Sequence, residues 1–500
     1  MSADLPHSGM SQYTVFAQRI GLAGVAKTII SLKGLIILPI LTKTLGTSDY
    51  GIWAQILVTV SLLQPFIHLG LGNATVRFLS SRGKREIGQG VLTALSVALL
   101  TSMIAALAVF LLSDFLAITL LGSESAAAAI RLGSLLIILE ALSAIALGSF
   151  RIFGQIKRYS IIILSQTALE IGLVAFFVLS GYGILGAIIS LLITRGIILL
   201  ITLYLIISHA GFAFPDFSLL RPYLVYGLPL VPTAIFALVV SSSDRYVIGS
   251  FMGAASVGIY SAAYGIGNVI SMFLGYIAYI LSPTIFSSYD KGRIAEVKTY
   301  LSYSWKYLLM FSIPSAFGLS ILAEPLLGSL TTVEFISAGR FIIPLVALSM
   351  IFYGVYAIFG EVVRLFKRTR IFPIVFGTAA ALNLGLNILL VPHWGIMAAA
   401  ITTLVAYAMV AVIMYYQAGK YLKFDTKLGF IIKSILSSAV MTSVIWIINP
   451  AGIVKILISI VIGAIIYFAI LFLLRGFSRN EIQFFFKLFK ETMGRIQIKR

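Results

Sequence analysis

Long apolar segments recur along the whole chain, and they restrict its fold more than any other feature of the sequence. Residues 184–207 and 454–474 are two of them, each with a single charged side chain. A helix rises 1.5 Å per residue, so about 20 apolar residues cross the roughly 30 Å hydrocarbon layer of a bilayer. Because hydrophobic residues make up 60% of the 500 positions and charged residues only 11%, we expect an all-α polytopic membrane protein with about 14 transmembrane helices.

The distribution of lysine and arginine predicts the orientation of these helices. Most of the 36 basic residues fall into every second connection, near residues 77–85, 151–158, 364–370 and 420–433, and after residue 474. Basic residues near span ends favour the cytoplasmic side. Both termini are therefore expected in the cytoplasm. The net charge of +19 then serves membrane topology, and we expect no nucleic-acid partner.

Two pairs of short sequences indicate an internal repeat. Residues 46–53 (GTSDYGIW) resemble residues 253–260 (GAASVGIY), and residues 183–187 (GILGA) resemble residues 395–399 (GIMAA). The first pair lies just after the first span of each half, and the second pair opens the sixth. The order of these landmarks predicts two six-helix lobes in parallel repeat, followed by two extra helices.

We therefore divide the chain into five parts. They are an N-terminal lobe (1–210, helices 1–6), an interfacial linker (211–222), a C-terminal lobe (223–420, helices 7–12), two extra helices (421–474) and a basic tail (475–500). In the tail, apolar residues at helical spacing oppose lysine and arginine. That pattern indicates an amphipathic helix lying in the membrane surface, and a solvated basic tail is the alternative.

The first span contains three cations, Arg19, Lys27 and Lys33. At 100° per residue, all three fit one helix face about 120° wide. Each charge at mid-bilayer costs about 2.5 to 3.5 kcal/mol unless it is paired or hydrated. We therefore expect this face to line a watery cavity. Arg19 is explained equally well by a side chain that reaches the cytoplasmic surface.

Further charged residues fall within later spans. Asp244 and Arg245 are adjacent in the seventh, and because neighbouring residues point 100° apart we do not expect them to neutralise each other. Arg245 is a candidate for the cavity lining, and a pair with a neighbouring helix is the alternative. Arg195, in the sixth span, either lines the cavity or forms a buried ion pair with Glu140 or Glu170.

Three cations near span ends, Arg131, Arg340 and Lys306, are expected to extend to the membrane interface. The charged residues that remain lie deep within the predicted spans: five cations (Arg19, Lys27, Lys33, Arg195 and Arg245) and three acids (Glu140, Glu170 and Asp244). The cavity is therefore expected to be net positive and to select anions. A phosphate or diphosphate attached to a lipid fits such a field.

Catalytic signatures are missing from the sequence. The chain has no cysteine, and its four histidines are scattered. His68 is interpreted as a packed helix residue. The predicted outer loops are short. We therefore expect a transporter rather than an enzyme, with no metal site and no cofactor beyond a possible coupling proton or Na⁺ at Glu140, Glu170 or Asp244.

The pattern resembles the polysaccharide transporter family, the Wzx-type flippases of the multidrug/oligosaccharidyl-lipid/polysaccharide exporter (MOP) superfamily. The resemblance lies in the opening span leading into GTSDYGIW (46–53), in SSSDRYVIG (241–249) leading to VGIYSAAY (257–264), and in LNLGLNILLVPHWGIMAAA (382–400). It implies a V-shaped cavity between two lobes in the cytoplasmic (inner) membrane, and alternating access for a polyprenyl-diphosphate-linked oligosaccharide. Cavity cations bind the headgroup in that family, which implies this role for Arg19, Lys27, Lys33 and Arg245.

The resemblance also implies the partners: the lipid-linked oligosaccharide, membrane lipids, and possible contacts with a polysaccharide polymerase and glycosyltransferases. Two other functions remain open. A MATE-type drug/cation antiporter would share the twelve-helix core but would favour acidic cavity residues. A membrane-integral glycan polymerase or ligase would normally need a large outer loop with catalytic side chains.

Overall fold

The computed structural model describes residues 9–477 and Glu481, with side chains from Leu32 onward apart from residues 275–280. These residues form helices and connections without any strand. Arg19 and Lys27 lie on the first helix, but their side chains are outside the described set, as is most of the basic tail. The N-terminal half contains the helices α1 (Gly9–His68), α2 (Leu71–Leu79), α3 (Lys84–Leu111), α4 (Ser113–Leu121), α5 (Ala126–Ile152), α6 (Ile156–Leu179) and α7 (Gly183–Ala210).

The rest of the chain is helical in the same way. It comprises η1 (Phe217–Leu219), α8 (Leu220–Gly227), η2 (Leu228–Leu230), α9 (Val231–Ser242), α10 (Asp244–Gly267), η3 (Asn268–Ile270), α11 (Ser271–Asp290), α12 (Ile294–Ile321), α13 (Ala323–Leu330), η4 (Val333–Phe335), α14 (Ile336–Leu365), α15 (Ile371–Trp394), α16 (Ile396–Gly419), α17 (Leu428–Ile448) and α18 (Ile453–Leu473).

Eleven helical segments of the described chain are long and apolar enough to cross a membrane, or up to twelve if the bent pair α12 and α13 forms one span. One of these segments, Phe217–Leu274, has 58 residues, which is far more than the 20 or so that one span needs. The expected fold class, an all-α polytopic membrane protein, is confirmed. The number fourteen is only roughly matched.

Two glycines break helices α1 and α10 at equivalent positions of the repeat. Gly46 within α1 has φ 75° and ψ −172°, and Gly253 within α10 has φ 77° and ψ 178°. This backbone conformation is essentially restricted to glycine, because a β-carbon would clash with the chain. Gly46 and Gly253 are the first residues of the two matching sequences, GTSDYGIW and GAASVGIY. Each glycine therefore reverses the chain at the same landmark of its half.

Beyond these breaks, the two copies of the repeat pack against each other reciprocally. A β-carbon on Gly51 would lie 1.9 Å from the carbonyl oxygen of Ala254, and one on Gly258 would lie 2.1 Å from that of Thr47. Gly51 corresponds to Gly258, and Thr47 to Ala254, with the same separation of 207 residues. This exchange of partners is the signature of a local pseudo-two-fold axis. We call this end of the molecule, with Gly46 and Gly253, the glycine end.

The short helices α4 and α13 extend this symmetry across the glycine end. Thr42, in the first half of α1, donates a hydrogen bond of 3.1 Å to the carbonyl oxygen of Leu330 in α13. At the matching place, a β-carbon on Gly249 of α10 would lie 2.2 Å from the carbonyl oxygen of Leu120 in α4. The first span of each half therefore docks on the short helix of the other half.

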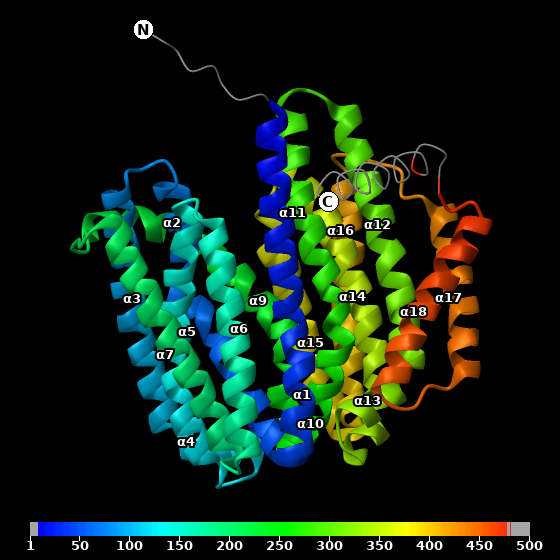
Figure 1. Cartoon of the computed structure of the whole chain (residues 1–500), viewed down its shortest axis with the longest axis horizontal. Helices are drawn as coiled ribbons and strands as arrows, with labels where there is room; N and C mark the ends of the chain where they lie inside the picture. The colour runs from blue at the N-terminus through cyan, green and yellow to red at the C-terminus, as the bar shows by residue number, and fades with distance from the viewer. Residues whose placement is uncertain (1–8, 478–480, 482–500) are drawn as a thin grey trace, which may run out of the picture.

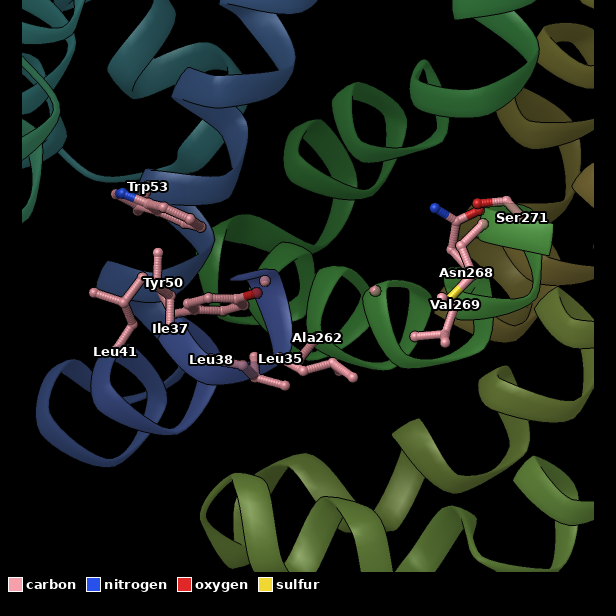
Figure 2. A pocket seen from close by; sticks show the side chains of 13 residues that line it. Leu35, Ile37, Leu38, Leu41, Tyr50, Trp53, Ala262, Asn268, Val269 and Ser271 are labelled. Carbon is pink, nitrogen blue, oxygen red and sulfur yellow. The ribbon is translucent and has the colours of Figure 1, made fainter. Parts of the chain in front are cut away.

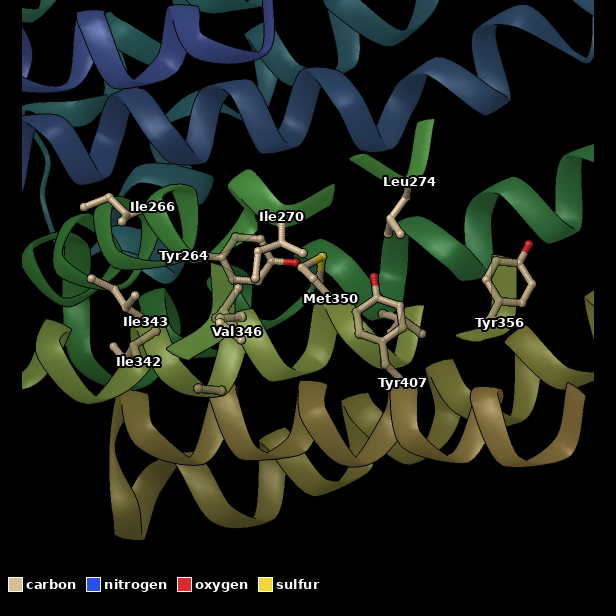
Figure 3. Close-up of a cluster of buried hydrophobic side chains, with 14 of the residues drawn as sticks. Tyr264, Ile266, Ile270, Leu274, Ile342, Ile343, Val346, Met350, Tyr356 and Tyr407 are labelled. Carbon is tan, nitrogen blue, oxygen red and sulfur yellow. The ribbon is translucent and has the colours of Figure 1, made fainter. Parts of the chain in front are cut away.

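The buried apolar residues form two separate cores. One is formed mainly by the second half of α1 and by helices α2 to α7, and the other mainly by the first half of α1 and by the helices from α9 onward. Val174 and Val178 of α6 also belong to the second core. Tyr264, Met350 and Tyr407 lie in the second core (Figure 3). Figure 1 shows two helical groups, with the first half of α1 beside the second group. We call these two groups the N-lobe and the C-lobe. The end of the molecule at which α1 begins and α18 finishes is called the terminal end.

Candidate functional site

Four of the charged residues singled out in the sequence form one network at mid-membrane. Lys33 of α1 donates to Glu170 of α6 over 2.7 Å, and Arg195 of α7 donates to the other oxygen of Glu170 over 3.0 Å. Arg195 also pairs with Glu140 of α5. The Glu170 side chain is only 4% exposed. One buried carboxylate therefore holds two cations from different helices.

This network resolves the alternatives left open for Arg195, which binds both glutamates. It also changes the expectation for Lys33, which is paired and only partly exposed in this conformation. Two cations and two acids leave the network formally neutral. The predicted excess of positive charge is therefore not found at these four residues.

Arg245 lies in a second buried cluster, inside the C-lobe. Its guanidinium donates to Asp244 over 2.9 Å and to the carbonyl oxygen of Ser241 over 2.8 Å. It also lies over the Tyr264 ring, 4.3 Å from the ring centre, while Tyr260 donates to Asp244 over 2.5 Å. The expectation that Asp244 and Arg245 could not neutralise each other was wrong. The long arginine side chain folds back along the helix far enough to reach its neighbour.

Two asparagines beside this cluster were missed as site candidates. Asn383 and Asn387 of α15 are fully buried. Asn387 donates to Asn383 over 3.2 Å and accepts a hydrogen bond of 2.9 Å from Thr402 of α16. The signal was present in the sequence, because two asparagines four residues apart in an apolar span lie on one helix face. Buried amides of this kind require partners within the lobe.

The span-end cations divide into two groups. Arg131 pairs with Asp114 over 2.5 Å and Arg340 with Glu324 over 3.0 Å, both partly exposed at the glycine end. Lys306 differs: its side chain is 6% exposed and pairs with Glu481 over 2.7 Å. Its expected extension to the membrane interface was wrong, because a residue that follows α18 folds back and supplies a buried carboxylate.

Two cavities lie between segments of the two lobes. A cavity of about 240 Å³ lies between α1 and the chain from α10 to α11, with Tyr50 and Trp53 on one side and Asn268 and Ser271 on the other (Figure 2). A larger cavity of about 710 Å³ lies nearer the terminal end, between α1, α2 and α5 of the N-lobe and α8 and α9. We call the larger one the interlobe cavity. The polar and charged residues that line it include Gln64, His68, Arg77 and Arg151.

Comparison with known proteins decides the family. The sequence profile of a family described as "Polysaccharide biosynthesis protein" matches residues 16–289, which is more than half of the chain, and the MatE profile matches residues 229–389. The chain belongs to the polysaccharide biosynthesis protein family. The resemblance to MOP-superfamily polysaccharide flippases is thereby confirmed.

Curated relatives of this family member include two proteins of Haloferax volcanii. The probable low-salt glycan biosynthesis flippase Agl15 is 22% identical over 257 residues, covering 51% of this chain and 54% of the relative. The probable flippase AglR is 24% identical over 260 residues, covering 50% and 53%. The chain thus spans about half the length of the curated relatives it matches.

Solved structures show the same fold. The lipid II flippase MurJ in an inward closed conformation superposes with a TM-score of 0.75 and 18% identity, covering 91% of this chain and 98% of that chain. An inward-facing multidrug resistance MATE transporter of the MOP superfamily gives a TM-score of 0.66 and 15% identity, covering 79% and 94%. The architecture is therefore that of the MOP superfamily.

Proposed function

We propose that this protein is a flippase that moves a polyprenyl-phosphate- or diphosphate-linked oligosaccharide across the cytoplasmic membrane by alternating access, for surface polysaccharide biosynthesis. The observation that carries the proposal is the cavity of about 710 Å³ that lies toward the terminal end, between α1, α2 and α5 of the N-lobe and helices α8 and α9. Away from this cavity the lobes touch, through backbone packing at the glycine end and through the ion pair of Lys33 with Glu170. Family membership and the flippase names of the relatives support the same activity.

In this mechanism the headgroup and sugars enter between the lobes while the lipid tail stays in the bilayer. The lobes then rock about the glycine end and expose the opposite side. The termini lie in the cytoplasm, and transport needs no covalent chemistry. The polymerase and glycosyltransferases of the same biosynthesis are the expected functional partners.

The cations Arg19, Lys27, Lys33 and Arg245 keep their predicted role in binding the anionic headgroup. Lys33 and Arg245 each hold a carboxylate in this conformation, so an incoming phosphate would compete with Glu170 and Asp244 for them. Protonation of these carboxylates, or of Glu140, is one way to couple transport to a proton gradient; Na⁺ binding to them is the other.

A reconstituted transport assay tests the proposal. The purified chain is placed in liposomes, and a fluorescently labelled polyprenyl-diphosphate oligosaccharide is followed across the bilayer by quenching from outside. We expect movement of this lipid and none of a cationic dye such as ethidium. Ethidium movement alone would favour a MATE-like antiporter, the function to which the MatE match points. Lengthening of the glycan in the same liposomes would favour a polymerase.

A further inference from the structure

Two basic connections of the C-lobe meet at the terminal end. One is the turn between α14 and α15, and the other is the connection between α16 and α17. The Phe366 ring of the first stacks on the Tyr421 ring of the second, with the ring centres 5.4 Å apart. The guanidinium group of Arg368 lies 5.9 Å from the centre of the same Tyr421 ring. No residue of either connection lines the two cavities between the lobes.

The stack of Phe366 on Tyr421 brings the exposed cations of the two connections together. We call these five residues the C-lobe basic patch: Lys367, Arg368 and Arg370 of the first connection, and Lys420 and Lys423 of the second. None of the five side chains forms an ion pair or a hydrogen bond within the described chain. The patch therefore holds positive charge on both of its connections without a protein counter-charge.

The acids around the patch do not compensate it. Asp425 pairs with Lys427 over 3.1 Å, and Glu361 pairs with Arg364. Asp290 follows Tyr289, whose ring meets the Phe366 ring edge-on at 5.4 Å, and it forms no ion pair with any of the five cations in the described structure. Like charges at short range repel one another. An anion bound between the two connections would remove that repulsion.

We propose that the C-lobe basic patch binds a phospholipid with two phosphates, one held by each connection, in the leaflet at the terminal end. This inference does not depend on the transported substrate. Guanidinium and ammonium groups donate charge-assisted hydrogen bonds to phosphate oxygens, and basic pockets at helix ends on the cytoplasmic side bind multiply charged headgroups. Lipid is favoured over an acidic protein segment because both connections join membrane spans at the level of the headgroups.

Membrane topology alone would also place basic residues at these span ends. Topology depends on the number of charges, however, and not on their arrangement around a ring. Lys157 and Arg158 are equally exposed cations at the terminal end of the N-lobe, and Arg158 donates to Gln155 over 3.0 Å. One lysine and one arginine can thus be removed from either lobe, which gives a control matched in charge.

Native mass spectrometry of the full-length protein in neutral detergent tests the site, because it gives the dissociation constant of the first bound lipid. The probes are cardiolipin, which has two phosphates, and phosphatidylglycerol, which has one. We expect cardiolipin to bind about tenfold more tightly. The double variant Arg368→Gln and Lys423→Gln should lose about tenfold in cardiolipin binding, because it removes one charge-assisted contact from each connection. The double variant Lys157→Gln and Arg158→Gln should bind as the parent does.

A second pair of variants leaves every charge in place. Tyr421→Leu removes the ring beside Arg368 and should weaken cardiolipin binding about threefold, as expected for an exposed cation–π contact. Tyr421→Phe keeps the ring and should restore the parent affinity. Melting temperatures of the same samples show whether each variant is folded, and only folded variants are compared.

Several results would overturn the proposal. One is equal affinity of the parent for cardiolipin and phosphatidylglycerol. Another is an equal loss in the two double variants, which would show that net charge alone attracts the lipid. Displacement of cardiolipin by equimolar pyrophosphate would assign the patch to a free diphosphate, and displacement by equimolar hexaglutamate would assign it to an acidic protein segment.

Discussion

At the scale of single residues, Glu170 explains how two cations remain stable within the membrane. A lone charge at mid-bilayer is costly, and Glu170 offsets this cost for Lys33 and Arg195 together. Removing one member of a buried ion pair is more damaging than replacing the whole pair, because the remaining charge is left without compensation. The stability of Lys33 and of Arg195 inside the protein should therefore depend more on the charge of Glu170 than on the other cation.

Glu170→Gln should destabilise the protein by about 3 kcal/mol, in the range found when buried ion pairs are broken. The glutamine keeps the volume of the side chain but not its charge, so Lys33 loses its ion pair with Glu170 while Arg195 keeps Glu140. Thermal unfolding in detergent, followed by helical circular dichroism, measures the change.

The matched control is Glu324→Gln, which removes the acid of the exposed pair with Arg340. Exposed ion pairs contribute about 0 to 1 kcal/mol, so this variant should unfold close to the parent temperature. Equal effects of the two substitutions would show that Glu170 is not the centre of a buried network.

The cluster around Asp244 permits a second test at this scale. Tyr260→Phe removes the hydroxyl that donates to Asp244 and leaves a buried acceptor with one partner fewer, which costs about 1 to 3 kcal/mol. Tyr204→Phe, at a side chain that is 71% exposed, should change nothing measurable. The same unfolding assay compares them, and an unchanged Tyr260→Phe variant would contradict the assigned hydrogen bond.

At the scale of the elements, the repeat becomes a physical contact. Gly51 and Gly258 are needed because backbone packs directly on backbone there: the carbonyl oxygens of Ala254 and Thr47 occupy the places that β-carbons would take. No flexible side chain can move aside, so any larger residue must separate the two spans. Gly51 and Gly258 therefore allow the close approach of the two backbones that closes the glycine end.

Gly258→Ala should therefore separate α1 from α10. We expect a destabilisation of about 1 to 3 kcal/mol, as for overpacked sites, or a shift of the lobes away from contact at the glycine end. Spin labels on cysteines introduced at Arg158 and Lys298, one in each lobe near the terminal end, would report that shift as a changed interlobe distance.

Gly265→Ala is the control on the same helix. A β-carbon at Gly265 meets nothing within 4 Å, and alanine favours the helix by about 1 kcal/mol over glycine. This variant should be neutral or slightly stabilised, with an unchanged interlobe distance. If both alanine variants behave alike, the reciprocal packing is not what closes this end.

At the scale of the whole molecule, the proposed transport requires the glycine end to open. Thr47, in the second half of α1, donates to Glu334 of η4 over 3.4 Å and so joins the two lobes there. The chain contains no cysteine, so a disulfide in a double-cysteine variant can form only between the two introduced cysteines. A covalent link across this contact would hold the lobes together at the glycine end.

The double variant Thr47→Cys and Glu334→Cys should lose lipid transport when it is oxidised and regain it on reduction, as the reconstituted assay would show. A cysteine pair at Ser123 and Ser125, whose hydroxyls lie 2.8 Å apart within one loop of the N-lobe, should transport equally in both states. Undiminished transport with a fully formed Thr47–Glu334 crosslink would rule out opening at this end.

The fold could be predicted from the sequence further than the site could. Hydropathy alone predicted an all-α membrane protein and, only roughly, the number of its spans, and the paired sequences 46–53 and 253–260 marked the two places where the helices break. Pairing was harder: Arg195 could be assigned to Glu140 or Glu170 only as alternatives, and the partner of Lys306 lies 175 residues away. The position of Arg77 and Arg151 in the interlobe cavity could not be distinguished from ordinary basic residues at span ends.

The sequence by itself determined that this chain is a helical membrane protein with repeated halves, because the bilayer requires every span to be long, apolar and internally hydrogen-bonded. Tertiary structure alone decided which of its charges are neutralised. Helix faces can be calculated from spacing, but partners depend on which helices become neighbours and on how far flexible side chains reach. Lys33, which we expected to line an open positive surface, is therefore held by Glu170, and available positive charge lies instead at Arg77 and Arg151.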